Sequence, residues 1–306
     1  MKQGTPCGLL LIDKTAGMTS HDVVRRVRRN LGLRRVGHAG TLDPFATGLL
    51  PCLVGPATRL VRFLHGWPKT YTGRIRLGEE TDTLDLEGTV TERRDPPLQP
   101  PPWKVLRELS RTLSGTYRQT PPAYSAKKIG GTRAHRLARQ GHAPVLQAIE
   151  ITVHRLRLQA SAPAELLFAA RVSSGTYIRS LARDLGRRLG TLGHLTVLRR
   201  TAIGPLSVRQ AVTTDVTRED MRAALIPLSA IPLPLPTIEL PDAGARDFCH
   251  GRAIQAPHPI PPAVEQHLRA VDSLHRLLGV ARVEKDGWIR PEVVLGQGLA
   301  DPDSGC

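Results

Sequence analysis

The chain of 306 residues is long enough to build one large domain and a smaller second one. Lys and Arg number 43 against 27 Asp and Glu, and the resulting net charge of +16 indicates a polyanionic partner. No apolar run approaches the ~20 residues of a membrane helix and no basic-then-apolar leader is present, so we expect a cytoplasmic protein without a membrane span. Four scattered cysteines and the lack of a histidine cluster argue against a zinc site, and we expect no metal.

The charge is divided unevenly along the chain. Residues 1–235 hold 36 Lys and Arg against 17 Asp and Glu, a net of +19, whereas residues 236–306 hold 7 against 10, a net of −3. Arginine-rich runs such as Arg25-Arg26-Val27-Arg28-Arg29 suit contacts with phosphates. The basic field therefore belongs to the first part of the chain, although a protein that only binds RNA would show the same charge.

The first predicted elements are a strand and a helix. Residues 9–13 form a short apolar run typical of a buried strand. Thr19 stands three residues before Asp22, as in a capping box, and the valines and leucine that follow repeat at helical spacing. The opposite face of this helix is rich in arginine.

The segment Gly37-His38-Ala39-Gly40-Thr41-Leu42-Asp43-Pro44-Phe45-Ala46-Thr47-Gly48 sets a single acidic residue among small ones. An Asp-Pro pair favours a tight turn, and its glycines allow the backbone to approach a ligand closely. Most such pairs are only turns, so these residues alone favour catalysis weakly. No lysine stands in the phosphate-loop position, which excludes the common nucleotide triphosphatase motif.

The middle of the chain alternates predicted strands, helices and loops. Residues 71–77 predict a strand with one buried side. The ring of Tyr71, its first residue, would point inward toward the core or a pocket. A Pro-rich surface connection, residues 95–102, precedes a helix over 103–113. Residues 119–141 contain Pro, Gly and five Lys or Arg and predict an exposed basic insertion.

A second strand, helix and strand follow at residues 165–173, 176–189 and 194–203. Gly190 closes the helix, and Arg179 lies in its first turn, off the apolar stripe. A short helix near residues 218–225 leads to residues 231–236, a Pro-rich extended linker at which we place the domain boundary. Beyond it, residues 264–278 have a helix-like pattern and residues 280–295 predict a β-hairpin around Asp286-Gly287.

These motifs together carry a resemblance. The Asp43 segment is similar to the signature of the bacterial tRNA pseudouridine-55 synthases, the TruB family. The resemblance recurs in order at Asp13-Lys14 with Gly17-Met18-Thr19-Ser20, at Lys69-Thr70-Tyr71, at residues 121–128, at Ser174-Gly175-Thr176-Tyr177-Ile178-Arg179 and at Leu198-Arg199-Arg200-Thr201. Thr15 departs from the proline usual in the first of these motifs.

The resemblance implies an α+β fold in two domains. Residues 1–235 would be a catalytic domain with a mixed, mostly antiparallel sheet, flanking helices and an RNA-clamping basic insertion at about 119–141. Residues 236–306 resemble a small β-rich PUA domain, an RNA-binding module, although this segment is net acidic. We expect a monomer with no protein partner, acting on the T-arm of tRNA.

The resemblance also assigns roles to residues. The implied enzyme isomerises uridine at position 55 to pseudouridine without a cofactor. Asp43 would be the nucleophile, attacking the base or the sugar or assisting elimination, with Arg179 as its partner and Tyr71 stacking on the flipped base. His38, Tyr71, Tyr177, Leu198 and Lys14 would bind the substrate, and Ile178 would add to the apolar wall.

Other interpretations of these residues stay open from the sequence alone. Tyr71 and Leu198 could be ordinary core residues, and Arg179 could pair with Asp184 or with phosphate. A tRNA-binding chaperone without chemistry would explain the basic charge. A metal-dependent nuclease or phosphohydrolase could use Asp13, His38 and Asp43, because carboxylates and imidazole suit such metals.

Overall fold

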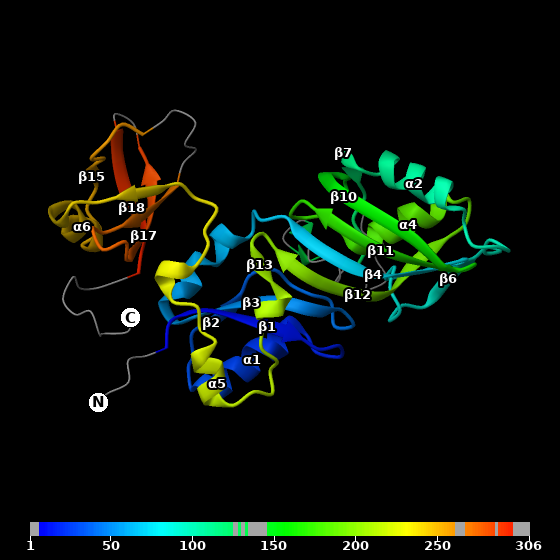
Figure 1. The fold of residues 1–306 in the computed structure, drawn as a ribbon, viewed down its shortest axis with the longest axis horizontal. Coiled ribbons are helices and arrows are strands. Elements are labelled where there is room, and N and C mark those ends of the chain that lie inside the picture. The colour runs from blue at the N-terminus through cyan, green and yellow to red at the C-terminus, as the bar shows by residue number, and fades with distance from the viewer. Residues whose placement is uncertain are drawn as a thin grey trace.

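The computed structural model describes residues 6–124, 128–129, 132–133, 146–260, 267–284 and 287–295. These residues form two sheets, a large one in the first part of the chain and a small one near the C-terminus (Figure 1). The α+β class and the mostly antiparallel pairing predicted from the sequence are confirmed.

The large sheet has nine strands, seven of which follow the spatial order β1-β3-β12-β4-β11-β10-β7. Every pair is antiparallel except β12 with β3, where Arg200 faces Gly48. Sequence neighbours such as β3 and β4 are therefore separated by β12, which returns from much later in the chain. The strands are β1 (Gly8–Lys14), β2 (Val36–His38), β3 (Thr47–Val54), β4 (Lys69–Leu77), β7 (Gly115–Gln119), β10 (Ile149–Ala162), β11 (Glu165–Val172), β12 (Gly193–Ile203) and β13 (Leu206–Ser207).

Helix α1 (Ser20–Leu31) begins at the predicted capping box. The side chain of Thr19 accepts a hydrogen bond from the Asp22 backbone N–H at 3.1 Å, and Asp22 accepts from the Thr19 backbone N–H at 2.9 Å. Gly32 ends the helix with φ 69°, a left-handed conformation that glycine adopts without strain. The buried side chains of α1 pack in one cluster with Leu10, Ile12, Leu50 and Cys52 from β1 and β3.

Two longer helices cover the other half of the sheet. Helices α2 (Trp103–Thr112) and α4 (Ile178–Arg188) contribute Leu106, Leu109, Leu181 and Leu185 to one core with β4, β10 and β11. Both match predicted helices to within a few residues, and the Pro-rich segment before α2 is a largely exposed connection. The remaining helices are α5 (Arg218–Ala223), α6 (Asp242–Cys249) and the 3-10 turns η1 (Gly55–Leu64), η2 (Val208–Gln210) and η3 (Leu228–Ala230).

Two short hairpins lie outside the main sheet. Strands β5 (Glu79–Thr81) and β6 (Val90–Arg93) pair antiparallel, and we call residues 79–93 the Asp85 hairpin. Strands β8 (Lys128–Ile129) and β9 (Thr132–Arg133) pair within the predicted basic insertion. Most of that insertion, including Lys127, lies outside the described residues.

The small sheet has the order β14-β16-β17-β18-β15, with α6 packed against it. Its strands are β14 (Thr237–Glu239), β15 (Ile254–Gln255), β16 (His267–Val271), β17 (Leu277–Val283) and β18 (Trp288–Val294). The predicted hairpin is confirmed by the antiparallel β17–β18 pair. The helix predicted from residue 264 onward is wrong, because residues 267–271 form strand β16. This strand pairs antiparallel with β17, a contact that sequence periodicity alone does not show.

The segment 231–236 connects the two sheets but is not a free linker. Ile231 and Leu233 are buried in one core that also contains Leu9 of β1 and Val280 of β17. Arg62 of η1 forms an ion pair with Glu292 of β18 at 2.5 Å. The small sheet therefore packs onto the first part of the chain through a shared apolar core.

Candidate active site

Asp43 lies in the loop of residues 39–46, between β2 and β3, which we call the Asp43 loop. The backbone N–H of Ala46 donates to the Asp43 carbonyl at 3.1 Å, so the predicted turn around Asp43-Pro44 is confirmed. Ser20, the first residue of α1, fixes the loop from below: its hydroxyl accepts from the Leu42 N–H at 2.9 Å. The loop is thus tied to the start of a helix one residue before Asp43.

The structure places Arg179 beside Asp43. The Arg179 Nε lies 3.1 Å from Asp43 Oδ2, and Nη2 donates to Oδ1 at 3.4 Å. Nη1 also donates to the Thr83 carbonyl and Nη2 to the Tyr124 carbonyl, each at 2.9 Å. The other partner considered for Arg179, Asp184, instead pairs with Arg183 at 2.8 Å.

A second carboxylate, which the sequence analysis did not single out, completes this arrangement. Asp85 Oδ2 lies 3.3 Å from Arg179 Nη1, and the Asp85 side chain is only 5% exposed. The hydroxyl of Thr83 donates to Asp85 Oδ1 at 2.6 Å, and the Glu87 N–H donates to the same oxygen at 3.1 Å. The only sequence signal was the Thr-x-Thr-x-Asp spacing at residues 81–85, in which the Thr81 hydroxyl donates to the Asp85 backbone carbonyl and the Thr83 hydroxyl to the Asp85 carboxylate.

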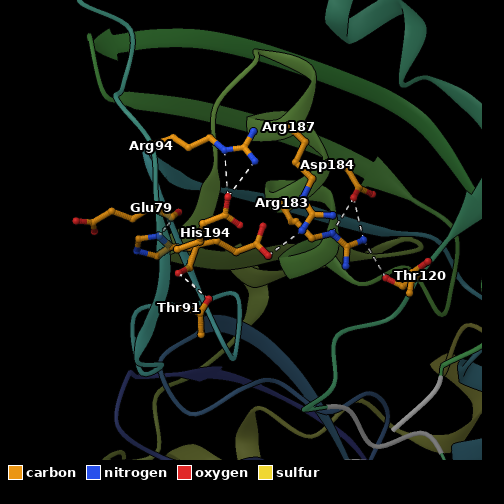
Figure 2. Close-up of polar contacts among 10 residues, drawn as sticks. Glu79, Thr91, Arg94, Thr120, Arg183, Asp184, Arg187 and His194 are labelled. Atoms are coloured by element: carbon orange, nitrogen blue, oxygen red, sulfur yellow. Dashed lines mark hydrogen bonds and ion pairs between the residues drawn. The ribbon is translucent and has the colours of Figure 1, made fainter. Parts of the chain in front are cut away.

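The Asp85 hairpin is held against α4 and β12 at its base (Figure 2). Arg187 of α4 donates to Glu80 at 2.9 Å, and a ring nitrogen of His194 lies 3.1 Å from the Glu79 carbonyl. Arg187 lies two helical turns beyond Arg179, so α4 contacts the hairpin both at its base and at its tip. The position of Asp85 is therefore coupled to the helix that carries Arg179.

Two buried cations hold the Asp43 loop from its other sides. The Lys14 ammonium donates to the carbonyls of Thr15, Met18 and Pro44 at 2.7 to 3.0 Å. Burial lowers the pKa of Lys14 to about 8. Arg200 donates to two carbonyls of the loop itself, those of Gly40 and Thr41. Lys14 was expected to contact the substrate, but in this structure its three donors all serve the backbone around Asp43.

The apolar residues named from the sequence come together beside Asp43. Tyr71 of β4, Leu198 of β12 and Ile178 of α4 belong to one buried cluster that also contains Leu42 and Phe45 of the Asp43 loop. Tyr71 is 7% exposed and Leu198 5%. The same residues can thus serve both as core and as the wall of a pocket, which the sequence alone left open.

Tyr177 and His38 lie at the start of α4 and at the end of β2. Tyr177 is the N-cap of α4, and the Gln119 side chain bonds to its backbone N–H at 2.9 Å and carbonyl at 3.1 Å. His38 ends β2, is half-buried, and its Nδ1 has no hydrogen-bond partner among the described residues. Burial, followed by the charge of Arg200, lowers the pKa of His38, so the imidazole is neutral at pH 7.

Burial and the neighbouring cations act in opposite directions on the pKa of Asp43. Burial raises the pKa of the Asp43 carboxyl above its ordinary value, and the nearby charge of Asp85 raises it further. Arg179, Lys14 and Arg200 act in the opposite direction. The Asp43 side chain is 33% exposed, so fixed cations hold a carboxylate that a substrate can still reach, which suits a nucleophile.

The geometry does not favour the metal-dependent alternative. Within the described ranges, no group of three or more His, Cys, Asp or Glu is arranged to hold a metal ion. Asp13 instead forms an ion pair with Arg199 at 2.6 Å, which occupies its carboxylate. Among the helices that the structure describes, none is long and apolar enough to cross a membrane.

Family models match most of the chain. The N-terminal domain of the TruB family pseudouridylate synthases matches residues 28–178. The tRNA pseudouridylate synthase B C-terminal domain matches residues 179–228, and the C-terminal model of pseudouridine synthase II TruB matches residues 236–295.

Similar proteins agree with these models. The chain is 47% identical over 256 residues to a tRNA pseudouridine synthase B of Thermobifida fusca, covering 81% of this chain and 86% of that protein. It is 40% identical to that of Gluconacetobacter diazotrophicus, covering 96% and 99%. Among solved structures, a Cbf5-Nop10-Gar1 complex gives a TM-score of 0.72 at 24% identity, over 93% of this chain and 80% of that chain. An H/ACA RNP bound to a substrate RNA containing 2′-deoxyuridine gives 0.73 at 22%, over 98% and 88%.

The chain shares its fold with these solved structures, and the family models place it in the pseudouridine synthase class. Within that class, the chain belongs to the TruB family of pseudouridylate synthases. The family resemblance seen in the sequence motifs is confirmed.

Proposed function

We propose that this protein isomerises uridine to pseudouridine in the T-arm loop of tRNA, at position 55, with Asp43 as the nucleophile. The observation that carries the proposal is the Asp43 carboxylate, held 3.1 Å from Arg179 beside the Tyr71 and Leu198 wall. The family membership supplies the reaction class. The geometry supplies a charged group and an apolar surface for a base.

The reaction is an internal rearrangement that needs no redox partner. The bond from N1 of uracil to C1′ breaks, the base turns, and C5 bonds to C1′ while the C5 proton is lost and N1 gains one. Asp43 can serve this sequence by attacking the base or C1′, or by assisting elimination at the sugar. We therefore propose a reaction without a cofactor.

The target base must leave the stacked RNA loop, which costs a few kcal/mol. Tyr71 would stack on the extruded base, and Leu198, Ile178 and Tyr177 would complete the pocket wall. His38, neutral and half-buried, would support the space that the base leaves. Arg179 would keep Asp43 charged and in position, and Lys14 would support the loop from beneath or contact the RNA.

We further propose that residues 1–235 form the catalytic domain and residues 236–306 a PUA-like RNA-binding domain. The separate small sheet and the change of net charge near residue 236 support this division. A monomer acting in the cytoplasm without a protein partner is the simplest form. Light scattering of the purified protein with and without tRNA tests the monomer.

The experiment is to map pseudouridine in a tRNA transcript after incubation with the purified protein and a chelator, with no added cofactor. We expect a new chemical primer stop at position 55 and none in a transcript with cytidine there. A protein that binds the transcript without forming pseudouridine would be a tRNA-binding chaperone instead. Cleaved RNA, or activity that the chelator removes, would indicate the nuclease.

A further inference from the structure

Arg200 is the largest fully buried side chain among the described residues, with only 1% of the residue exposed. Its guanidinium donates to three backbone carbonyls. Nε donates to Leu49 at 2.8 Å, Nη2 to Gly40 at 2.8 Å and Nη1 to Thr41 at 3.3 Å. One side chain therefore bonds to the Asp43 loop two residues before Asp43 and to the strand that follows the loop.

The backbone of Arg200 is equally constrained. In β12 it faces Tyr71 of β4 on one side and Gly48 of β3 on the other. Gly48 has φ 103°, and a Cβ there would lie 2.2 Å from the Arg200 carbonyl oxygen. β3 and β12 approach so closely that only glycine fits, and this approach brings the guanidinium under the loop.

Arg200 has no carboxylate partner among the described residues, unlike its neighbours. Arg199 pairs with Asp13, and Arg179 pairs with Asp43 and Asp85. Burying an unpaired guanidinium costs several kcal/mol of desolvation, which neutral carbonyls offset only in part. The buried guanidinium therefore adds little to the free energy of unfolding. It does leave a fixed positive charge next to the nucleophile.

We propose that Arg200 is a positioning residue for the nucleophile: its guanidinium clamps the first part of the Asp43 loop to strand β3 and so fixes the Asp43 carboxylate against Arg179. The proposal rests on the proposed function of Asp43 and names a second residue on which that function depends. Among the described contacts, the Arg200 guanidinium bonds to backbone carbonyls and not to the Asp43 carboxylate, so its effect passes through the backbone and through its charge.

Two variants separate these two effects. Arg200→Lys keeps the charge but cannot form the three-carbonyl fork, because an ammonium is a compact point charge. Arg200→Met removes both. In single-turnover pseudouridine formation we expect a fall in the rate constant of about tenfold for Lys and about a hundredfold for Met. The Kd for tRNA should change less than about threefold, since Arg200 is buried.

Leu268→Ala is the stability control. Leu268 lies in β16 and is buried in the core of the small sheet, a cluster that contains none of the residues placed around Asp43. This truncation lowers the free energy of unfolding. Its single-turnover rate should stay at the wild-type value once corrected for the folded fraction, so a loss in the Arg200 variants cannot be attributed to destabilisation.

The pH profile gives a readout that a purely structural role would not move. Asp43 faces Arg179 of α4, Lys14 of β1, Asp85 and Glu87 of the Asp85 hairpin, and Arg200 of β12. The Arg200 charge lowers the Asp43 pKa, so its loss raises that pKa. The acidic limb of the rate profile should shift to higher pH in Arg200→Met and stay in place in Arg200→Lys.

Amide hydrogen exchange tests the clamp without any turnover. Arg200→Met should raise exchange over residues 39–49 and leave β10 and β11 protected. Folded Arg200 variants with the wild-type rate, pH profile and exchange would overturn the proposal while leaving the function intact. If the wild type forms no pseudouridine, the function fails, and the exchange result alone then decides whether Arg200 clamps the loop.

Discussion

Arg179 and Asp85 form an ion pair of 3.3 Å in which the two side chains are 10% and 5% exposed. The same guanidinium reaches Asp43 at 3.1 Å, so one arginine bridges the partly exposed Asp43 and the buried Asp85. A bridging arginine has little freedom to leave Asp43, because its far side is anchored. Asp85 is therefore part of what orients the nucleophile, although it lies behind it.

Replacing Asp85 by Asn tests this bridge. Arg179 would lose one of its two carboxylate anchors, and we expect the single-turnover rate to fall about ten- to a hundredfold with tRNA affinity nearly unchanged. The charge of Asp85 raises the Asp43 pKa, so its removal lowers that pKa. The acidic limb of the rate profile should accordingly shift to lower pH.

Asp82→Asn is the matched control, since Asp82 is in the same hairpin but, among the contacts described, its side chain bonds only to the Thr89 backbone N–H. It should keep both the rate and the pH profile of the wild type. An Asp85→Asn variant with wild-type rate and profile would remove Asp85 from the account.

Tyr71 offers a test of base stacking. Tyr71→Phe keeps the ring, whereas Tyr71→Leu keeps only apolar volume. If the ring face is what the flipped base needs, Phe should retain most of the binding energy and Leu should lose about 1–3 kcal/mol of it. Rapid-mixing measurement of base extrusion with a fluorescent base analogue checks this. Equal loss in both variants would assign the role to the hydroxyl instead.

Lys14→Met should lower stability. The carbonyls of Thr15, Met18 and Pro44 would all lose a charged donor, at a cost of about 1–3 kcal/mol. Denaturant unfolding gives the free energy of unfolding directly. An unchanged midpoint would show that water replaces the ammonium, and a loss of tRNA affinity without loss of stability would favour a direct RNA contact.

Removing residues 237–306 should destabilise the catalytic part rather than only weaken RNA binding. The deletion would uncover Leu9 and Ile231, which are fully buried in the core shared with the small sheet. Thermal unfolding should show a lowered Tm. Trp288→Ala, a change at a side chain 44% exposed, is the control that leaves this core intact. A truncated protein with the wild-type Tm would show that the two parts are independent.

Local patterns predicted the elements well because local physics determines them. The capping box at Thr19 and the apolar spacing of α4 depend on neighbours within a few residues. Asp85 and Arg200 were missed because their roles depend on contacts between distant segments. Asp85 reaches the site because its hairpin folds onto α4, and Arg200 because strand β12 returns beside β3. The helix predicted near residue 264 failed because pairing with β17 overrides a helical pattern.

In the proposed reaction, the charge of Asp43 performs the chemistry. Asp43→Asn keeps the shape of the side chain and removes that charge. Single-turnover conversion of tRNA uridine, measured with saturating enzyme, should fall below detection in this variant while tRNA binding stays within about threefold of wild type. Conversion by Asp43→Asn at the wild-type rate would show that the Asp43 carboxylate is not the nucleophile.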